Sequence, residues 1–218
     1  MESALFIAGS LAFVGAIFGL NWYLAKKRTE TMQAYSESRG YTLEGDAHSI
    51  GAQLHDFKLF NQGHSARIRN AMRGVKETGA VHICDYQYST GSGKNRTTHH
   101  QTIALLHTPG RRAPHFFMRR QVRFLDAIGK VFGGQDINFE EDSDFSKTWV
   151  LQSNGDEALL RRFLSPALRE HLNRLAHRNL VVEVNGDLMV IHQSRRLGKH
   201  EDIDALLADA VNIRRHWN

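Results

Sequence analysis

The uncharged run near the start of the chain constrains the fold more than any other feature of the sequence. Residues 4–20 read ALFIAGSLAFVGAIFGL and contain no ionisable side chain. A helix rises about 1.5 Å per residue, so residues 4–24 would cover roughly the 30 Å of a bilayer's hydrocarbon layer. The sequence therefore predicts a transmembrane anchor within residues 1–28.

The residues that follow this run predict the orientation of the anchor. Trp22 and Tyr23 are amphipathic rings of the kind that settle at the headgroup boundary. Lys26, Lys27 and Arg28 come next, and basic residues beside a span are retained on the cytoplasmic side. We expect a single-pass membrane protein, with the lipid bilayer as a partner and everything after Arg28 in the cytoplasm.

A cleaved secretory signal is the main alternative to an anchor. Such signals start with positive charge, contain a shorter apolar run and end in small residues at a cleavage site. Here the chain starts with Met1-Glu2-Ser3, and the basic cluster follows the long run. The pattern favours an anchor that is retained.

Gly15 and Gly19 form a GxxxG spacing within the run. Small residues at this spacing let two helix backbones approach closely, which predicts a homodimer through the transmembrane helix. The other interpretation is that glycine is simply frequent in membrane helices.

The charge balance argues against a nucleic-acid partner. The chain has a net charge of +5, from 28 Lys and Arg against 23 Asp and Glu. Without Lys26, Lys27, Arg28 and Glu2, 25 basic residues remain against 22 acidic ones, a net charge of only +3. Attraction to an anionic inner leaflet is consistent with this excess.

The rest of the chain predicts an α+β fold, an antiparallel β-meander packed with amphipathic helices. Helical periodicity occurs at 29–39, 121–132, 156–176 with a bend at Pro166, and 201–215. Strand-like runs occur at 41–43, 56–61, 65–73, 80–88, 97–107, 115–118, 137–139, 145–152, 180–184 and 188–192. Short turns between consecutive strands favour a meander with one solvated face. We expect a helical linker at 29–40, the meander and one helix at 41–135, and an α+β lobe at 136–218 that forms one continuous body with it.

The loop STGSGKNRTT combines glycines with a lysine and so invites comparison with a phosphate-binding loop. A P-loop needs a glycine five positions before its Gly-Lys pair and Ser or Thr after the lysine. Here Tyr88 and Asn95 stand at those positions, and the loop leads into a strand, not a helix. A hairpin turn explains the residues better.

The residues around the single cysteine suggest the alternative of an enzyme. If Thr97 pairs with Tyr88 across the turn, Cys84 lies opposite Gln101, and His82 and His99 share its face. Such a set would suit a zinc site or a Cys-His nucleophile, and therefore a membrane-bound hydrolase or metal-dependent enzyme that also uses the neighbouring His100. Against this, the chain has no HExxH or CxxC spacing, and a lone cysteine is commonly buried as a small apolar residue.

Basic residues cluster before and within the predicted helix at 121–132, with Phe116 and Phe117 between them. They predict a surface for a lipid headgroup or a partner protein, although a charged helix face is often only solvated. The cluster comprises Arg111, Arg112, Arg119, Arg120 and Arg123.

Part of the sequence resembles a family of uncharacterised bacterial proteins. The resemblance is carried by Asp85-Tyr86-x-Tyr88, Thr90-Gly91-Ser92-Gly93-Lys94 and Gln101-Thr102, a DYxY…TGSGK…QT motif. It extends from the anchor through the region of Phe145. It implies one N-terminal membrane helix and a cytosolic domain of unknown function, without a known activity, cofactor or catalytic residue.

Together these features predict a non-enzymatic binding or scaffold module at the inner membrane. We expect no cofactor, an unidentified protein partner and no nucleic acid.

Overall fold

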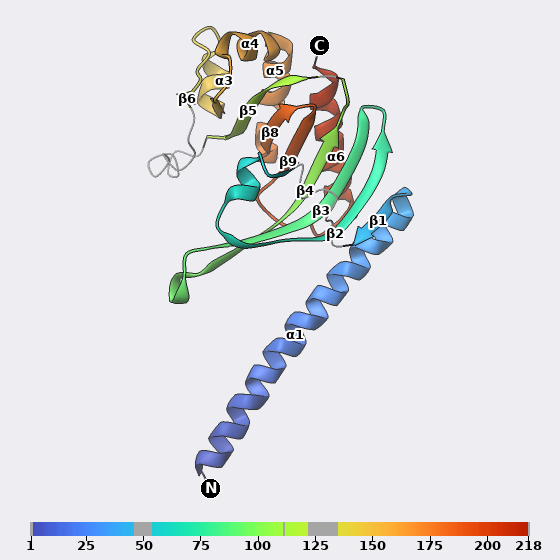
Figure 1. The fold of residues 1–218 in the computed structure, drawn as a ribbon, viewed down its shortest axis with the longest axis vertical. Coiled ribbons are helices and arrows are strands. Elements are labelled where there is room, and N and C mark those ends of the chain that lie inside the picture. The colour runs from blue at the N-terminus through green and yellow to red at the C-terminus, as the bar shows by residue number, and fades with distance from the viewer. Residues whose placement is uncertain (1, 46–53, 111, 122–134, 218) are drawn as a thin grey trace. The chain divides into compact units, whose positions relative to one another are not determined.

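A computed structural model of the chain describes residues 2–45, 54–110, 112–121 and 135–217 (Figure 1). The chain forms two compact units, residues 1–43 and residues 44–218, each of which is described by itself. The predicted helix at 121–132 lies almost entirely outside the described residues.

The first unit consists mainly of one helix, α1 (Glu2–Arg39), so the predicted linker is helical and continues the preceding helix without a break. The helix ends at Gly40, as predicted. Gly40 has a φ of +68°, a conformation that side chains other than glycine disfavour. The Gly40 N–H donates to the Glu37 carbonyl at 3.4 Å, and the Tyr41 N–H donates to the Ser36 carbonyl at 2.8 Å. This pair of bonds satisfies carbonyls that the end of a helix otherwise leaves without a donor.

The second unit contains an antiparallel sheet with the eight strands β2 to β9 (Figure 1). Their order is β2-β3-β4-β9-β8-β5-β7-β6, and the short strand β1 (Thr42–Gly45) stands before β2 in the same order. The α+β class is therefore confirmed. The strands are β2 (His64–Lys76), β3 (Gly79–Thr90), β4 (Thr97–His107), β5 (Ala113–Arg120), β6 (Gln135–Asp136), β7 (Trp149–Ser153), β8 (Val181–Gly186) and β9 (Leu188–His192).

The predicted meander is correct only for β2, β3 and β4. The next strand in the chain, β5, does not pair with β4 but lies between β8 and β7. The hairpin of β8 and β9, which turns at Asn185-Gly186-Asp187, occupies the place beside β4 instead. Short connections indicate antiparallel neighbours, but they do not exclude the later insertion of a hairpin between two consecutive strands.

The predicted bent helix at 156–176 is two helices, α4 (Glu157–Phe163) and α5 (Pro166–Arg174). Ser165 caps the second helix by accepting a hydrogen bond from the Leu168 N–H, and Pro166 occupies its first turn. Proline suits this position because its missing N–H would be without a helical partner anyway. A short 3-10 turn, η4 (Ala176–Arg178), follows α5.

Two predicted strands are partly or wholly helical. Residues 56–61 form a turn and the 3-10 helix η1 (Lys58–Asn61), in which the Lys58 N–H binds the Glu183 side chain. Residues 143–148 form α3 (Ser143–Thr148), which Asp142 caps by accepting from the Phe145 N–H, so β7 begins only at Trp149. In both places side chains with oxygen acceptors take backbone N–H groups that a strand would use. The predicted strand at 137–139 is displaced to β6.

Both faces of β3 are covered, so the prediction of one solvated face is wrong for this strand, whereas β2 exposes Arg67, Arg69 and Arg73. Cys84 and Tyr86 pack against Leu54, Phe57 and other residues of the segment before β2. The helix α6 (His200–Arg215) packs on β4 and β9, and the β4 residues that alternate with this cluster, Ala104 and Leu106, are buried as well. The predicted helix at 201–215 is confirmed as α6, and its inward residues are all buried: Ile203, Leu206, Leu207, Ala210 and Ile213.

Candidate functional site

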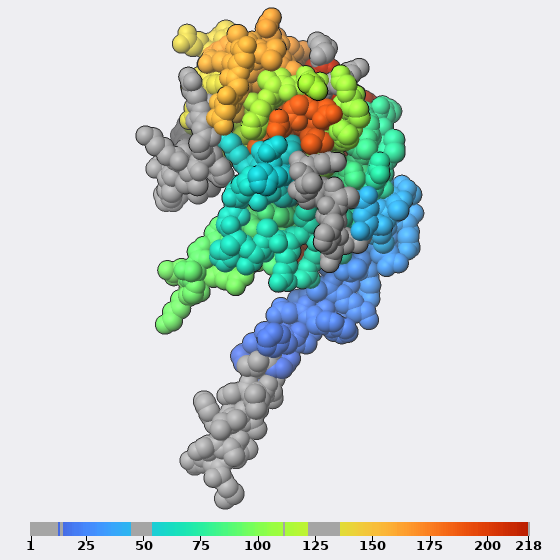
Figure 2. All heavy atoms as spheres, viewed as in Figure 1, coloured from blue at the N-terminus to red at the C-terminus, as the bar shows by residue number. Residues whose placement is uncertain are grey.

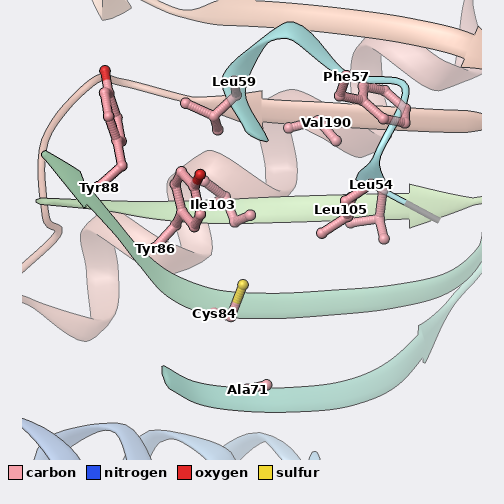
Figure 3. Close-up of a cluster of buried hydrophobic side chains, with 10 residues drawn as sticks. All are labelled: Leu54, Phe57, Leu59, Ala71, Cys84, Tyr86, Tyr88, Ile103, Leu105 and Val190. Carbon is pink, nitrogen blue, oxygen red and sulfur yellow. The ribbon is translucent and has the colours of Figure 1, made fainter. Parts of the chain in front are cut away.

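The structure places Cys84 inside the hydrophobic core of the second unit (Figure 3). It shares this cluster with Leu54, Ala71 and Ile103, and the residue is only 2% exposed. Burial, followed by the charges of Asp85 and Glu44, raises the pKa of the thiol far above its usual range. A nucleophilic or zinc-binding cysteine acts as the thiolate, so this environment opposes both roles.

The register assumed for the hairpin is wrong by two residues. Thr97 pairs with Thr90, not with Tyr88, and Cys84 pairs with Ile103, not with Gln101. His99 pairs with Tyr88, which lies four residues from Cys84 on β3. Four residues correspond to about 13 Å along a strand, so His99 and Cys84 lie far apart.

The three residues of the predicted Cys-His-His set are therefore engaged separately. His82 Nδ1 lies 3.2 Å from the Glu44 carboxylate, and burial lowers the pKa of His82 although Glu44 raises it. His99 Nε2 lies 2.8 Å from the Thr90 hydroxyl, and its ring stacks on Tyr88 with centroids 4.7 Å apart. Among the described residues, no group of three or more His, Cys, Asp or Glu side chains could hold a metal ion.

We predict that Cys84 reacts with a thiol reagent about 100-fold more slowly in the folded chain than after unfolding in urea, because burial suppresses the thiolate. Absorbance of the released chromophore measures the rate. A Ser92→Cys variant provides an exposed thiol in the hairpin turn as the matched control. If Cys84 were labelled as fast as that control, the core environment described above would be wrong.

The loop STGSGKNRTT is a hairpin turn. It connects β3 to β4 through a short 3-10 turn, η2 (Gly93–Asn95), and Gly91 and Gly93 have φ values of +70° and +55°. The Cβ of any larger residue at position 91 would collide with the Asn95 carbonyl, so the turn requires glycine there. The tip of this hairpin projects from the rest of the second unit (Figures 1 and 2).

The structure describes three members of the predicted arginine surface, Arg112, Arg119 and Arg120, so the surface as a whole stays a prediction. Arg111 and Arg123 lie outside the described residues. Arg119 and Arg120 are consecutive in β5 and therefore point to opposite faces of the sheet. Arg120 donates to the Asn179 side chain at 2.9 Å, and Arg112 is exposed.

The motif residues Asp85 and Thr102 face each other across β3 and β4 and belong to a buried polar network. The Thr102 hydroxyl donates to one Asp85 oxygen at 3.0 Å, and the Asn70 amide donates to the other at 3.0 Å. The Leu197 N–H donates to the Thr102 hydroxyl at 3.0 Å. The network therefore fastens the loop after β9 to the middle of the sheet. Asn70 has a φ of +52° and lies at an irregularity of β2.

This loop completes a set of exposed basic residues that the sequence analysis did not identify. In the register of the sheet, Arg67, Gln87 and His100 form one row across β2, β3 and β4, and Arg69, Asp85 and Thr102 form the next row. Because alternate residues share a face, both rows lie on the same side of the sheet. We call the set of Arg67, Arg69, Arg96, His100 and Arg196 the basic face.

Two contacts hold members of the basic face in place. Arg196 donates to His100 Nδ1 at 2.9 Å, and Arg96 donates to the Ser89 hydroxyl at 3.1 Å. Although His100 is exposed, partial desolvation of its ring, followed by the guanidinium of Arg196, lowers its pKa, and Arg69 contributes in the same direction. In the sequence, this surface is indicated only by the alternating arginines of residues 65–73, which read SARIRNAMR. The contribution of Arg196, about 130 residues further along, depends on the tertiary fold.

A second polar cluster joins η1 to the sheet. The buried Glu183 carboxylate accepts two hydrogen bonds from the Lys58 N–H, at 2.9 and 3.0 Å, and lies 3.3 Å from His115 Nε2. The Lys58 ammonium donates to Gln152, which in turn donates to Asp136. Burial lowers the pKa of Lys58, while the carboxylates of Glu183 and Asp136 raise it. Each group has a partner within the cluster, and the arrangement holds the segment over β8.

The first unit exposes large apolar side chains. The predicted anchor falls partly on residues whose side chains lie outside the described part of the chain, but from position 15 onward the side chains are described, as is Phe13. We call the exposed set the apolar girdle: Phe13, Ile17, Phe18, Leu20, Trp22, Tyr23 and Leu24, which are 45–70% exposed. At about 100° per residue these side chains point to all sides of the helix.

The end of the girdle carries the predicted interfacial residues. The Lys26 ammonium lies 5.5 Å from the centre of the Trp22 ring, and Tyr23, Lys27 and Arg28 follow on the same helix. Apart from the helix's own nearby backbone, no described residue lies within 4 Å of a Cβ built on Gly15 or Gly19, and self-association through this pair stays a prediction.

No helix in the part of the chain that the structure describes combines the length and the apolar character needed to cross a membrane.

Comparison with known proteins shows a likeness in fold alone. No protein-family model matches the chain, and no match is found among the curated proteins. Among solved structures, the chain is similar to the crystal structure of the mycobacterial trehalose monomycolate transport factor A, TtfA. The TM-score is 0.55 and the sequence identity is 12%, over 86% of this chain and 93% of the other.

Proposed function

We propose that the chain is a membrane-anchored, non-enzymatic binding module that assists a transport system in the membrane. The observation that supports this most is the apolar girdle on α1, where large side chains point to all sides and to solvent. A helix that is apolar all round belongs either in the core of a large protein or in a bilayer. In the sequence, the girdle overlaps the uncharged run at 4–20 and extends it to Leu24, and the combined length suits one bilayer crossing.

The basic residues after the girdle support an orientation. Lys26, Lys27 and Arg28 favour the cytoplasmic side, and the contact of Lys26 with Trp22 is of the kind found at the headgroup boundary. In this proposal residues 44–218 lie in the cytoplasm of a bacterial cell. An active cytoplasmic reporter fused to the C-terminus would agree with this orientation, and an active periplasmic phosphatase fused there would overturn it.

The similarity to TtfA supports the part of the proposal that concerns transport. That protein is named as a transport factor for trehalose monomycolate, and the fold likeness extends over most of both chains. Crosslinking in intact membranes, followed by purification of the chain, is expected to recover an integral membrane transport protein. Recovery of no such protein would overturn the transport part without affecting the anchor.

We predict that a Phe13→Arg substitution moves the full chain from the carbonate-resistant membrane fraction toward the soluble fraction. Phe13 lies near the middle of the predicted span, where an arginine costs about 2.5 kcal/mol on insertion scales. Quantitative blotting of the two fractions measures the shift. Gln33→Arg adds the same charge to an exposed position of α1 beyond the girdle and is expected to change nothing. A wild-type chain that carbonate extracts completely would contradict the anchor.

A further inference from the structure

The basic face concentrates positive charge on one side of the sheet. Arg67 and Arg69 project from β2 in adjacent rows, while Arg196 reaches the same area from the loop after β9 and binds His100. All four arginines and His100 are exposed. The Asp85 network fastens this loop through Thr102 and Leu197, so the position of Arg196 is determined by buried hydrogen bonds.

The arginines of the basic face lack, within the described residues, the carboxylate partners that five other arginines of the second unit have. Arg161, Arg169, Arg174, Arg178 and Arg215 each form an ion pair with an Asp or Glu. Within the described residues, no ion pair involves Arg67, Arg69, Arg96 or Arg196. The nearest carboxylate in the register is Asp85, which is 4% exposed and accepts hydrogen bonds from Thr102 and Asn70. The outward charge of the face is therefore left for an external anion.

We propose that the basic face binds the anionic phospholipid headgroups of the membrane to which the chain is anchored. Guanidinium groups bind phosphate oxygens with two parallel hydrogen bonds, and a sheet surface presents several of them side by side. The inference rests on the proposed function in one respect, because the anchor supplies the high local concentration of lipid that makes several weak contacts sufficient. Each basic residue close to an anionic surface raises the binding constant about fivefold.

The test uses the full chain held in nanodiscs of neutral phosphatidylcholine, so that the anchor is already occupied. Vesicles containing phosphatidylglycerol are added, and co-flotation measures the contact between the second unit and the anionic surface. The triple variant Arg67→Gln, Arg69→Gln, Arg196→Gln is expected to bind about 100-fold more weakly than the wild type. Raising the salt from about 0.1 M to about 1 M shortens the screening length to about 3 Å and should abolish binding.

The matched control is the triple variant Arg161→Gln, Arg174→Gln, Arg215→Gln, which removes the same charge from arginines that are ion-paired. Its binding is expected to stay within about twofold of the wild type. Equal binding by both triple variants, or equal binding of the wild type to purely neutral vesicles, would overturn the proposal. Displacement of the vesicles by millimolar glycerol phosphate would also overturn it, because the face would then be a site for a soluble anion.

The anchor is tested separately in the same preparation. Incorporation into the neutral nanodiscs reports on α1 and does not involve the basic face. If incorporation fails, the anchor is wrong, and the vesicle assay performed on the chain without nanodiscs still decides whether the basic face binds anionic lipid.

Discussion

Replacing Asp85 by alanine is expected to lower the free energy of unfolding of the second unit by about 4 kcal/mol. Asp85 is 4% exposed, and both of its oxygens accept hydrogen bonds. Without the carboxylate, the Asn70 amide and the Thr102 hydroxyl lose their acceptor in the interior, where a polar group without a partner costs about 1–3 kcal/mol. A small cavity adds to this loss.

Urea unfolding of the full chain in detergent measures the effect, with the fluorescence of Trp149 and Trp217 as the signal. Both rings are buried in the second unit, so their emission reports on its core. Glu170→Ala removes an exposed carboxylate that pairs with Arg174, and it should cost less than about 0.5 kcal/mol. An Asp85→Ala variant as stable as this control would show that the network does not stabilise the fold.

The stability of the second unit is expected to fall by about 2 kcal/mol between pH 7 and pH 5 through His192 alone, with about 3 kcal/mol lost in total at lower pH. His192 is buried at the end of β9, and burial lowers the pKa of its imidazole from 6.5 to about 4. The Ser194 N–H donates to Nδ1 at 3.0 Å, so that nitrogen is held in its unprotonated form. Protonation would both charge a buried ring and remove this acceptor.

The sign follows from the two protonation states. The unfolded chain binds a proton at His192 below about pH 6.5, whereas the folded chain resists it until about pH 4. Stability from the neutral ring is therefore fully present above pH 6.5, declines as the pH falls through this window, and stops declining below the folded value. Burial also lowers the pKa values of His82 and His171, which add to the slope in the same direction.

Unfolding free energies of the wild type and of His192→Asn, measured at several pH values, isolate the contribution of this ring. Asparagine offers an acceptor for the Ser194 N–H but does not titrate, so the variant should lose about 2 kcal/mol of pH dependence between pH 7 and pH 5. His177→Gln changes an exposed histidine and should keep the wild-type slope. Identical slopes in His192→Asn and the wild type would contradict the prediction.

Local signals predicted the parts of the fold that depend on neighbouring residues. The helix end at Gly40, the turn at Gly91 and the hairpin around Gly186 all depend on backbone conformations that only a few residue types adopt. The inward face of α6 was readable because its apolar spacing has the period of a helix. Residues 58–61 and 145–148 were misread as strands, since their helical turns depend on the acceptors Glu183 and Asp142.

The candidate site was less predictable than the fold. Cys84, His82 and His99 suggested a site because cysteine and histidine bind zinc and take part in nucleophilic catalysis. The register of β3 and β4 differs by two residues from the one assumed, and this difference separates His99 from Cys84. The arginines of β2 lie in a run, 65–73, that the sequence predicted only as a strand. Their place beside His100 and Arg196 depends on the tertiary fold, because the loop after β9 brings Arg196 to His100.

The sequence by itself determined the uncharged run and its basic flank, the α+β class and most of the turns, because these follow from composition and from spacing over a few residues. Only the tertiary structure decided that β5 leaves the meander, that Cys84 is buried and that Asp85 holds the loop after β9. Strand order, register and the approach of distant loops depend on contacts between residues far apart in the chain, and no local pattern encodes such contacts.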